Sequence, residues 1–218
     1  MKTYKVRQST SPDAEDFAKF ADSAEICEFR GESSPHRPHT EFRLLYNNVG
    51  ISGRFDVQDQ FVRAVNLDYN SPVCTDSCVE FFVKPPDSSG YFNFEFNCIG
   101  TILSYYITDH RKTEDGFAEF AVIPPELLTN IKVETSLPHA VIDPEITKTV
   151  HWSLSFFIPF SIFAEFAENF QIPEPGDSWR ANFYKCGDKT SHPHWAAWSP
   201  VPELNFHLPD AFGSITFV

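Results

Sequence analysis

The polar residues with the clearest potential for chemistry alternate with apolar residues in three segments. They are Glu80, Glu95, Asn97, Arg180 and Tyr184. If the three segments are neighbouring strands, these groups share one sheet surface, because alternate side chains point to the same face. Carboxylate, amide, guanidinium and phenol groups at fixed positions suit sugar hydroxyls, which both donate and accept hydrogen bonds. The alternative is that they are ordinary solvent-facing residues of a sheet.

A second candidate region is segment 192–200, in which two Trp follow two His. An exposed ring of Trp195 or Trp198 can stack on the apolar face of a sugar while its indole N–H donates a hydrogen bond. Their spacing places them on opposite faces of a strand, so we expect one in the core and one at the surface. His192 and His194 have zinc-ligand chemistry, but no third ligand is identifiable, and no metal is expected.

Catalysis is weakly indicated. Glu80 and Glu95 would suit a glycoside hydrolase only if they face one cleft. The motifs G-x-S-x-G, H-E-x-x-H and the P-loop do not occur. We therefore expect binding without catalysis, and a hydrolase that uses Glu80 and Glu95 on glycosyl bonds is the alternative.

The cysteines and loop acids do not indicate a cofactor. An odd number of cysteines, five, is not typical of a disulfide framework. We expect free thiols, with a Cys74–Cys78 bridge or a zinc site at this pair as alternatives. Structural calcium is a further alternative, although no loop has EF-hand spacing. The residues considered for calcium are Asp56, Asp59, Asp68, Asn70 and Asp76.

The charge of the chain limits its partners. Among 218 residues, 17 Lys and Arg stand against 30 Asp and Glu, a net charge of −13. Nucleic acid and anionic membrane surfaces are therefore not expected as partners, because both need clustered cations. Residues 1–8 are charged and lack the apolar segment of a signal peptide. With the odd number of cysteines, this predicts a cytoplasmic location; a secreted or periplasmic one is the alternative if a leader was removed.

Period-two alternation predicts β-strands along most of the chain. It occurs in segments 41–46, 51–57, 78–83, 92–97, 150–158, 179–184 and 215–217, and residues 48–50 predict a hairpin turn. A short helix is predicted after the cap Ser11-Pro12-Asp13, with Phe17, Phe20, Ala21 and Ala24 on one stripe, and a second after Pro159. Residues 124–130 predict a turn or a single helical turn. The expected fold is all-β, a jelly-roll-like antiparallel β-sandwich with one or two short helices.

Three segments resemble family 9 carbohydrate-binding modules. Residues 76–82 look like the D-S-V-E strand of that family, and 91–100 are similar to the strand that follows in family-9-like proteins of gut-type bacteria. Residues 198–213 resemble the closing W-S-P … P-x-x-F-G signature. With the segments beginning at Trp152 and Trp179, the likeness covers roughly residues 40–218 in a shared order.

The resemblance implies a non-catalytic β-sandwich that holds sugar between two aromatic rings. Its carboxylate ligand falls on Glu80 and one aromatic wall falls near Phe206. The other wall, a Trp, falls near Val73 and is lost, and the family's strand arginine falls near Glu95, a reversal of charge. The fold therefore carries over better than the ligand.

We expect a single carbohydrate-binding domain over residues 1–218, with 1–40 as an N-terminal extension that carries a short helix. Its ligand would be an oligosaccharide or polysaccharide, in a role linked to glycan breakdown. An interaction scaffold without a ligand is a further alternative. The expected ligand-binding residues are Glu80, Glu95, Asn97, Arg180, Tyr184, Trp195, Trp198 and Phe206.

Overall fold

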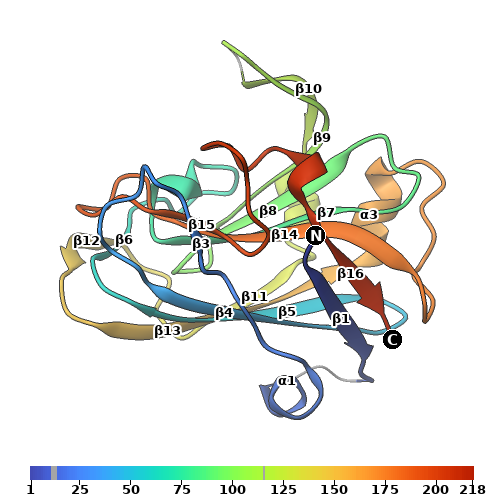
Figure 1. Cartoon of the computed structure of the whole chain (residues 1–218), viewed down its shortest axis with the longest axis horizontal. Coiled ribbons are helices and arrows are strands. Elements are labelled where there is room, and N and C mark those ends of the chain that lie inside the picture. The colour runs from blue at the N-terminus through green and yellow to red at the C-terminus, as the bar shows by residue number, and fades with distance from the viewer. Residues whose placement is uncertain (11–13, 115) are drawn as a thin grey trace.

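The alternating Phe- and Val-rich segments form strands whose apolar sides meet between two stacked β-sheets (Figure 1). The structure is a computed structural model and describes residues 1–10, 14–114 and 116–218. In the view of Figure 1 one sheet lies above the other, and we call them the upper and the lower sheet. The predicted β-sandwich is confirmed.

The upper sheet contains the three segments that carry most of the candidate site residues. Its strands, in spatial order, are β10 (Gly116–Val122), β9 (Ile102–Thr113), β8 (Tyr91–Asn97), β7 (Cys78–Lys84), β14 (Ser178–Cys186) and β16 (Gly213–Phe217). A short strand, β15 (Trp195–Ala197), pairs with β14 and with β3 (Glu28–Phe29). The β9–β10 hairpin extends above the sheet in Figure 1.

The lower sheet is built around the predicted hairpin, with β4 (His39–Tyr46) and β5 (Gly50–Asp59) antiparallel. Its other strands are β13 (Val150–Pro159), β11 (Lys132–Thr135) and β2 (Ala24–Glu25). Strands β6 (Val62–Ala64) and β12 (Ile142–Ile146) form a separate pair. Strand β1 (Thr3–Gln8) runs parallel to both β16 and β4. The segment expected as an N-terminal extension therefore joins the two sheets, and the strand pairing is not wholly antiparallel.

Phe rings fill the space between the sheets. Phe183 on β14 stacks on Phe42 of β4, with 3.5 Å between ring centroids, and on Phe81 of β7 at 5.0 Å. All three side chains are buried. Burying a Phe contributes about 2–3 kcal/mol, and a ring pair adds about 1 kcal/mol. The inner faces of β7 and β14 are thereby held in place, so their alternate residues must point outward.

The helices are short and lie outside the two sheets. Helix α2 (Pro125–Leu128) is the predicted helical turn, and α3 (Phe160–Phe166) begins after Pro159 as predicted, with Phe163 buried. Helix α1 (Ala14–Phe20) is shorter than predicted: Phe17 is buried but Phe20 is exposed, and Ala24 already belongs to β2. Its expected cap, residues 11–13, lies outside the described residues. No helix of the described ranges is long and apolar enough to cross a membrane.

Candidate functional site

Glu80, Glu95 and Tyr184 form one row across three neighbouring strands. Glu80 on β7 lies opposite Tyr184 on β14 and opposite Glu95 on β8. Directly opposite residues project from the same face of a sheet. Here this is the outer face, because the inner face is occupied by the Phe core. The condition stated for a shared surface, that these segments are neighbouring strands, is met.

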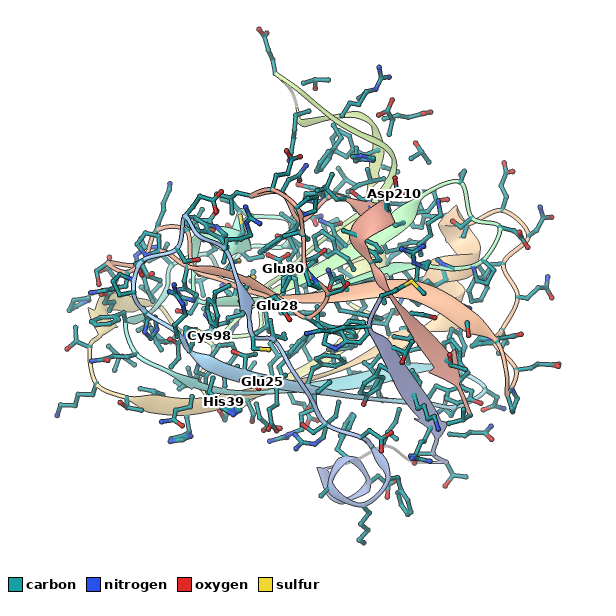
Figure 2. All side chains as sticks on the ribbon, viewed as in Figure 1. Glu25, Glu28, His39, Glu80, Cys98 and Asp210 are labelled. Carbon is teal, nitrogen blue, oxygen red and sulfur yellow. The ribbon has the colours of Figure 1, made fainter. Side chains whose placement is uncertain are left out.

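Above this row the outer face is hollowed by a cavity of about 300 Å³, which we call the carboxyl pocket. It is lined by Glu80, Glu95, Asp188, Lys112, Trp195 and Phe206. Cys74, Cys186, Leu204, Asn205 and His207 complete its wall. Figure 2 shows Glu80 at the level of the upper sheet, below the C-terminal segments that cover this face. The pocket is thus floored by strands and walled by loops.

The two glutamates at the floor are almost completely buried. Glu80 accepts a hydrogen bond from the Cys186 thiol, with 3.1 Å between Oε1 and Sγ, and Glu95 accepts one from the Asn93 amide at 2.8 Å. Burial, and then repulsion from Glu95, raise the pKa of Glu80 well above its ordinary value. Burial also raises the pKa of Glu95 to about 7, while the Asn93 hydrogen bond opposes the shift. Near neutral pH the pair can therefore hold a proton and both donate and accept hydrogen bonds.

Asp188 and Trp195 form the next part of the wall. Trp195 lies opposite Cys186 in the β15–β14 pairing, so its ring projects from the outer face beside the pocket. Its indole Nε1–H donates to Asp188 Oδ1 at 2.7 Å. Burial raises the pKa of Asp188, and the indole hydrogen bond opposes the rise. The hydrogen bond sets the orientation of the ring at the cavity.

Phe206 provides the second aromatic side chain of the pocket. Its ring stacks on Tyr184, with centroids 4.0 Å apart and planes 12° apart. The Tyr184 hydroxyl donates to the Phe206 carbonyl at 3.0 Å. Tyr184 is fully buried, so it supports Phe206 from below rather than facing the cavity itself.

Lys112 and His207 are the nitrogen bases of the wall. The Lys112 ammonium lies 4.0 Å from the centroid of the Phe117 ring, a cation–π arrangement. Burial lowers the pKa of Lys112, and Glu95 opposes the shift. His207 Nδ1 shares a 2.9 Å hydrogen bond with the Tyr91 hydroxyl, and burial, then Lys112, lower the pKa of His207 well below its ordinary value. His207 is therefore neutral at pH 7.

Besides Tyr184, which lies beneath the pocket, three residues expected to bind ligand lie outside it. Asn97 is buried and donates to the Asn66 carbonyl and to Asp76. Arg180 donates to the carbonyls of segment 209–213 and so anchors the end of the chain. Trp198 is buried against the core ring Phe183, with centroids 5.7 Å apart. Alternation did place one Trp in the core and one at the surface, while the contacts of Asn97, Arg180 and Trp198 are with other parts of the chain.

Most residues considered for a metal are engaged by protein groups. His194 uses Nδ1 on the His192 carbonyl and Nε2 on Lys185, so the His pair offers no free ligand atom from His194. Asp59 pairs with Lys185 and His36, and Asp76 with Arg63 and two backbone N–H groups. These two carboxylates therefore have partners within the protein.

The five cysteines are free thiols, and two of them lie beside Glu80. The ligand atoms of Cys78, Cys186 and Glu80 lie within 4.8 Å of one another. Burial raises the pKa of the Cys78 thiol to about 12, and a hydrogen bond with Cys78, then burial, raise that of Cys186. A metal that bound this group would have to displace the thiol protons.

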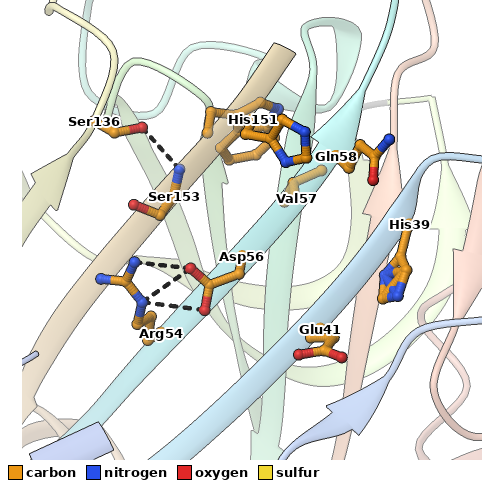
Figure 3. Close-up of a pocket in the computed structure, with 10 residues that line it drawn as sticks. His39, Glu41, Arg54, Asp56, Val57, Gln58, Ser136, His151 and Ser153 are labelled. Atoms are coloured by element: carbon orange, nitrogen blue, oxygen red, sulfur yellow. Dashed lines mark hydrogen bonds and ion pairs between the residues drawn. The ribbon is translucent and has the colours of Figure 1, made fainter. Parts of the chain in front are cut away.

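A second hollow, of about 450 Å³, lies on the outer face of the lower sheet (Figure 3). We call it the charged groove, and it is lined by His39, Glu41, Arg54, Asp56, His151 and Ser153, among others. Arg54 Nη2 lies 2.7 Å from Asp56 Oδ1, and Arg43 Nη1 lies 2.8 Å from Asp56 Oδ2. Its one aromatic residue, Trp152, is buried. The groove thus has paired charges and exposed imidazole rings, but no exposed Phe, Tyr or Trp among the described residues that line it.

Comparison with known proteins identifies the family. A family model described as carbohydrate-binding family 9 matches residues 10–217. The chain belongs to carbohydrate-binding family 9. The match extends the likeness seen in the sequence to the N-terminal segment. The function that this family description gives is carbohydrate binding.

Solved structures agree with this assignment. A candidate carbohydrate-binding protein from Bacteroides uniformis is 29% identical, with a TM-score of 0.84, and the match covers 100% of this chain and 99% of that one. A family 9 module from Caldicellulosiruptor kristjanssonii in complex with glucose is 11% identical with a TM-score of 0.65, covering 100% and 96%. The same module in complex with cellotriose is 12% identical with a TM-score of 0.66, and the match covers 99% of this chain and 93% of that one. At this identity the latter two show the fold alone.

One curated relative matches from a fungus. It is an "Extracellular protein" of Arthroderma benhamiae, 25% identical over 190 residues, which cover 83% of this chain and 79% of the relative.

Sequence reasoning missed several residues that line the pocket of this family 9 module. Lys112 lies near the end of β9, a strand whose residues 102–107 are mostly apolar without alternation, so no face could be assigned. Asp188 lies two residues beyond Cys186, the last residue of β14. An acidic residue so close to the end of a site strand could have indicated a place in the pocket. His207 follows Phe206 in the closing motif, but of these two the sequence indicated a ligand-binding role for Phe206 alone.

Proposed function

We propose that this family 9 module binds a saccharide unit in the carboxyl pocket and does not transform it. The observation that carries the proposal is one cavity that combines two aromatic side chains with buried hydrogen-bonding carboxyl groups. The family membership and the glucose and cellotriose complexes of the Caldicellulosiruptor module support a saccharide as the ligand. Recognition of oligosaccharides or polysaccharides during glycan breakdown is the setting we propose.

The chemistry of the lining matches the two sides of a sugar ring. Trp195 and Phe206 offer apolar surface to the C–H groups of the ring. Glu80 and Glu95, with raised pKa values, can donate to one hydroxyl and accept from another. Asn205 adds an amide to the wall. We expect the ring to lie against the aromatic side chains with its hydroxyls toward the floor.

The dimensions of the pocket favour a short ligand segment. A volume of about 300 Å³ is at the lower end of the range for small-molecule sites. A pocket of this size holds one or two sugar units rather than the length of a chain. We therefore expect the module to recognise a terminal unit.

The arrangement of the acids supports binding rather than hydrolysis. Glycoside hydrolases place two carboxyl groups on either side of the scissile bond, and one of them must be ionised. Glu80 and Glu95 instead lie next to each other on one sheet surface, as register partners. Burial raises the pKa of both, which disfavours the ionised form.

The cellular location has two alternatives, cytoplasmic and exported. The name of the Arthroderma relative, "Extracellular protein", supports export. We propose the exported alternative, since extracellular glycans are the natural targets of such a module.

The test is titration of the full chain with a panel of soluble oligosaccharides, followed by tryptophan fluorescence and calorimetry. We expect at least one saccharide to quench the fluorescence, and Trp195→Ala to weaken its binding about 30-fold, near 2 kcal/mol. Glu80→Gln, which cannot ionise, is expected to change affinity as well. Tyr69→Ala, which removes an exposed aromatic residue outside the pocket, is the matched control and should bind as the wild type does. Binding that survives Trp195→Ala would contradict the assignment of this pocket.

A further inference from the structure

The carboxyl pocket contains more acid than its own cations can neutralise. It holds the carboxyl groups of Glu80, Glu95 and Asp188 against the single ammonium of Lys112. No ion pair within the described ranges joins any of these three carboxyl groups to a Lys, Arg or His. Lys112 itself lies over the Phe117 ring. When its acids ionise, the pocket therefore has a deficit of positive charge.

This deficit is particular to the pocket. The other buried acids have a cation at close range: Asp59 has Lys185 at 3.1 Å, and Asp76 has Arg63 at 3.3 Å. Buried carboxylates are normally paired, because an isolated buried charge costs several kcal/mol. Without such a partner the raised pKa values of Glu80 and Glu95 favour the protonated form, and the pocket acids can ionise when a positive group enters the pocket from outside the chain.

Each acid of the pocket also has unused accepting capacity. Glu80 accepts from a thiol, Glu95 from an amide and Asp188 from an indole N–H, each through one oxygen. All three donors are neutral. Within the described part of the chain, no hydrogen bond reaches the second oxygen of any of these carboxyl groups. The second oxygens can accept bonds from a ligand in the cavity.

We propose that the saccharide bound by the carboxyl pocket carries a protonated amino group, as a glucosamine unit does. The inference rests on the proposed function, because it names the class of sugar for the same site. An ammonium group donates up to three hydrogen bonds and supplies the missing charge. N-acetylation removes that charge, so an acetylated or neutral sugar gains less. The aromatic side chains still receive the apolar face of the ring, and Trp195 can add a cation–π contact.

Proton release accompanies such binding. An ammonium beside Glu95 lowers the pKa of that carboxyl from about 7, so part of a proton leaves on binding near pH 6.5. The other charged or titratable groups that face Glu80 and Glu95 are Asp188, Lys112, Lys185, His207, Tyr91, Tyr105, Tyr184, Cys74, Cys78 and Cys186. Burial raises the pKa of the tyrosines, Cys74 and Cys78, and a hydrogen bond with Cys78, then burial, raises that of Cys186, so these groups stay protonated; burial lowers the pKa of His207, which stays neutral. The released proton therefore comes from the carboxyl groups.

The experiment is calorimetric titration of the full chain with glucosamine, glucose and N-acetylglucosamine. It is performed at about pH 6.5, where an amino group is protonated. We expect glucosamine to bind at least about tenfold tighter than either other sugar. Glu95→Gln and Asp188→Asn should each reduce this preference below about threefold, whereas Glu134→Gln, at an exposed strand position, retains it. Titration in two buffers of different ionisation enthalpy should show proton release with glucosamine and none with glucose.

The possible failures are distinguishable. Equal affinity for glucosamine and glucose overturns this inference and leaves saccharide binding intact. A preference for glucosamine that both pocket variants retain also overturns it, as does the absence of proton release from the wild type. Failure of every sugar, including the broad panel, overturns the proposed function itself.

Discussion

The charged groove and the carboxyl pocket lie on opposite outer faces of one sandwich and are built from similar residue types. In the groove Asp56 is paired with Arg43 and Arg54 and is open to solvent. In the pocket Glu80 and Glu95 are almost fully buried and accept hydrogen bonds only from neutral groups among the described residues. The carboxylate of the groove is thus paired with arginines of the chain, whereas the carboxyl groups of the pocket have no such ion pair among the described residues.

This difference shows where the molecule can use charge for recognition. Paired surface charges contribute little to stability and leave little for a ligand. Buried, unpaired carboxyl groups lower stability, and a chain retains such groups where a ligand compensates them. The hollow with the larger volume is therefore the weaker candidate for a binding site.

The largest effect on stability should come from breaking the buried ion pair between Lys185 of the upper sheet and Asp59 of the lower sheet. Burial alone would raise the pKa of Asp59, but the Lys185 ammonium and a hydrogen bond from His36 hold it below its ordinary value. Lys185→Met leaves this buried carboxylate without its ammonium and should cost about 3–5 kcal/mol in the free energy of unfolding. Urea denaturation near neutral pH measures it, with Lys132→Met at an exposed position as the control. A loss below about 1 kcal/mol would show that the pair is dispensable.

In the carboxyl pocket, removing a charged group is expected to increase the free energy of unfolding rather than to lower it. The pKa of Glu95 is about 7 in the folded chain against an ordinary 4.5, so ionisation above pH 4.5 favours the unfolded state. Stability is therefore full below that pH and falls as the pH rises to about 7. Glu95→Gln removes this penalty and should stabilise the protein by about 2–3 kcal/mol near pH 8 and by little near pH 4.

Thermal and urea unfolding at the two pH values check this prediction. Glu134→Gln, an exposed carboxylate on β11, provides the matched control and should show no such pH-dependent gain. A Glu95→Gln variant less stable than the wild type at high pH would mean that a cation already compensates Glu95. The contrast between the two faces would then disappear.

The smallest effect is expected in the charged groove. Asp56→Asn breaks the pairs with Arg43 and Arg54 and should destabilise the fold by about 0.5–1 kcal/mol. Because salt screens exposed pairs, the loss should shrink at about 1 M salt. Saccharide affinity should not change. Altered binding in this variant would indicate that the groove takes part in recognition.

Much of the fold could be predicted because alternation reports burial directly. Strands β4, β5, β7, β8, β13, β14 and β16 lie where period-two patterns place them. Strand β9 lacks that pattern along most of its length, and β1 contributes only two buried residues, Tyr4 and Val6, to the core. Such segments become strands through pairing with distant neighbours, which local sequence does not report.

The candidate site could be predicted only in part. Glu80, Glu95, Trp195 and Phe206 do meet at one cavity. Asn97 and Arg180 share the polar outer alternation of their strands, yet one bonds Asp76 and the other bonds backbone carbonyls near the end of the chain. Alternation assigns a residue to a face but does not say which other segment covers that face.

The sequence by itself therefore determined the sandwich, the outward side of β7, β8 and β14, and the family. Local pattern suffices for these, because apolar burial acts on every second residue of a strand. Only the tertiary structure decided that loops after β14 and near the C-terminus enclose Glu80 and Glu95, with no ion pair to either glutamate among the described residues. Charge pairing and solvent exclusion depend on contacts between residues far apart in the chain, so they are properties of the assembled fold.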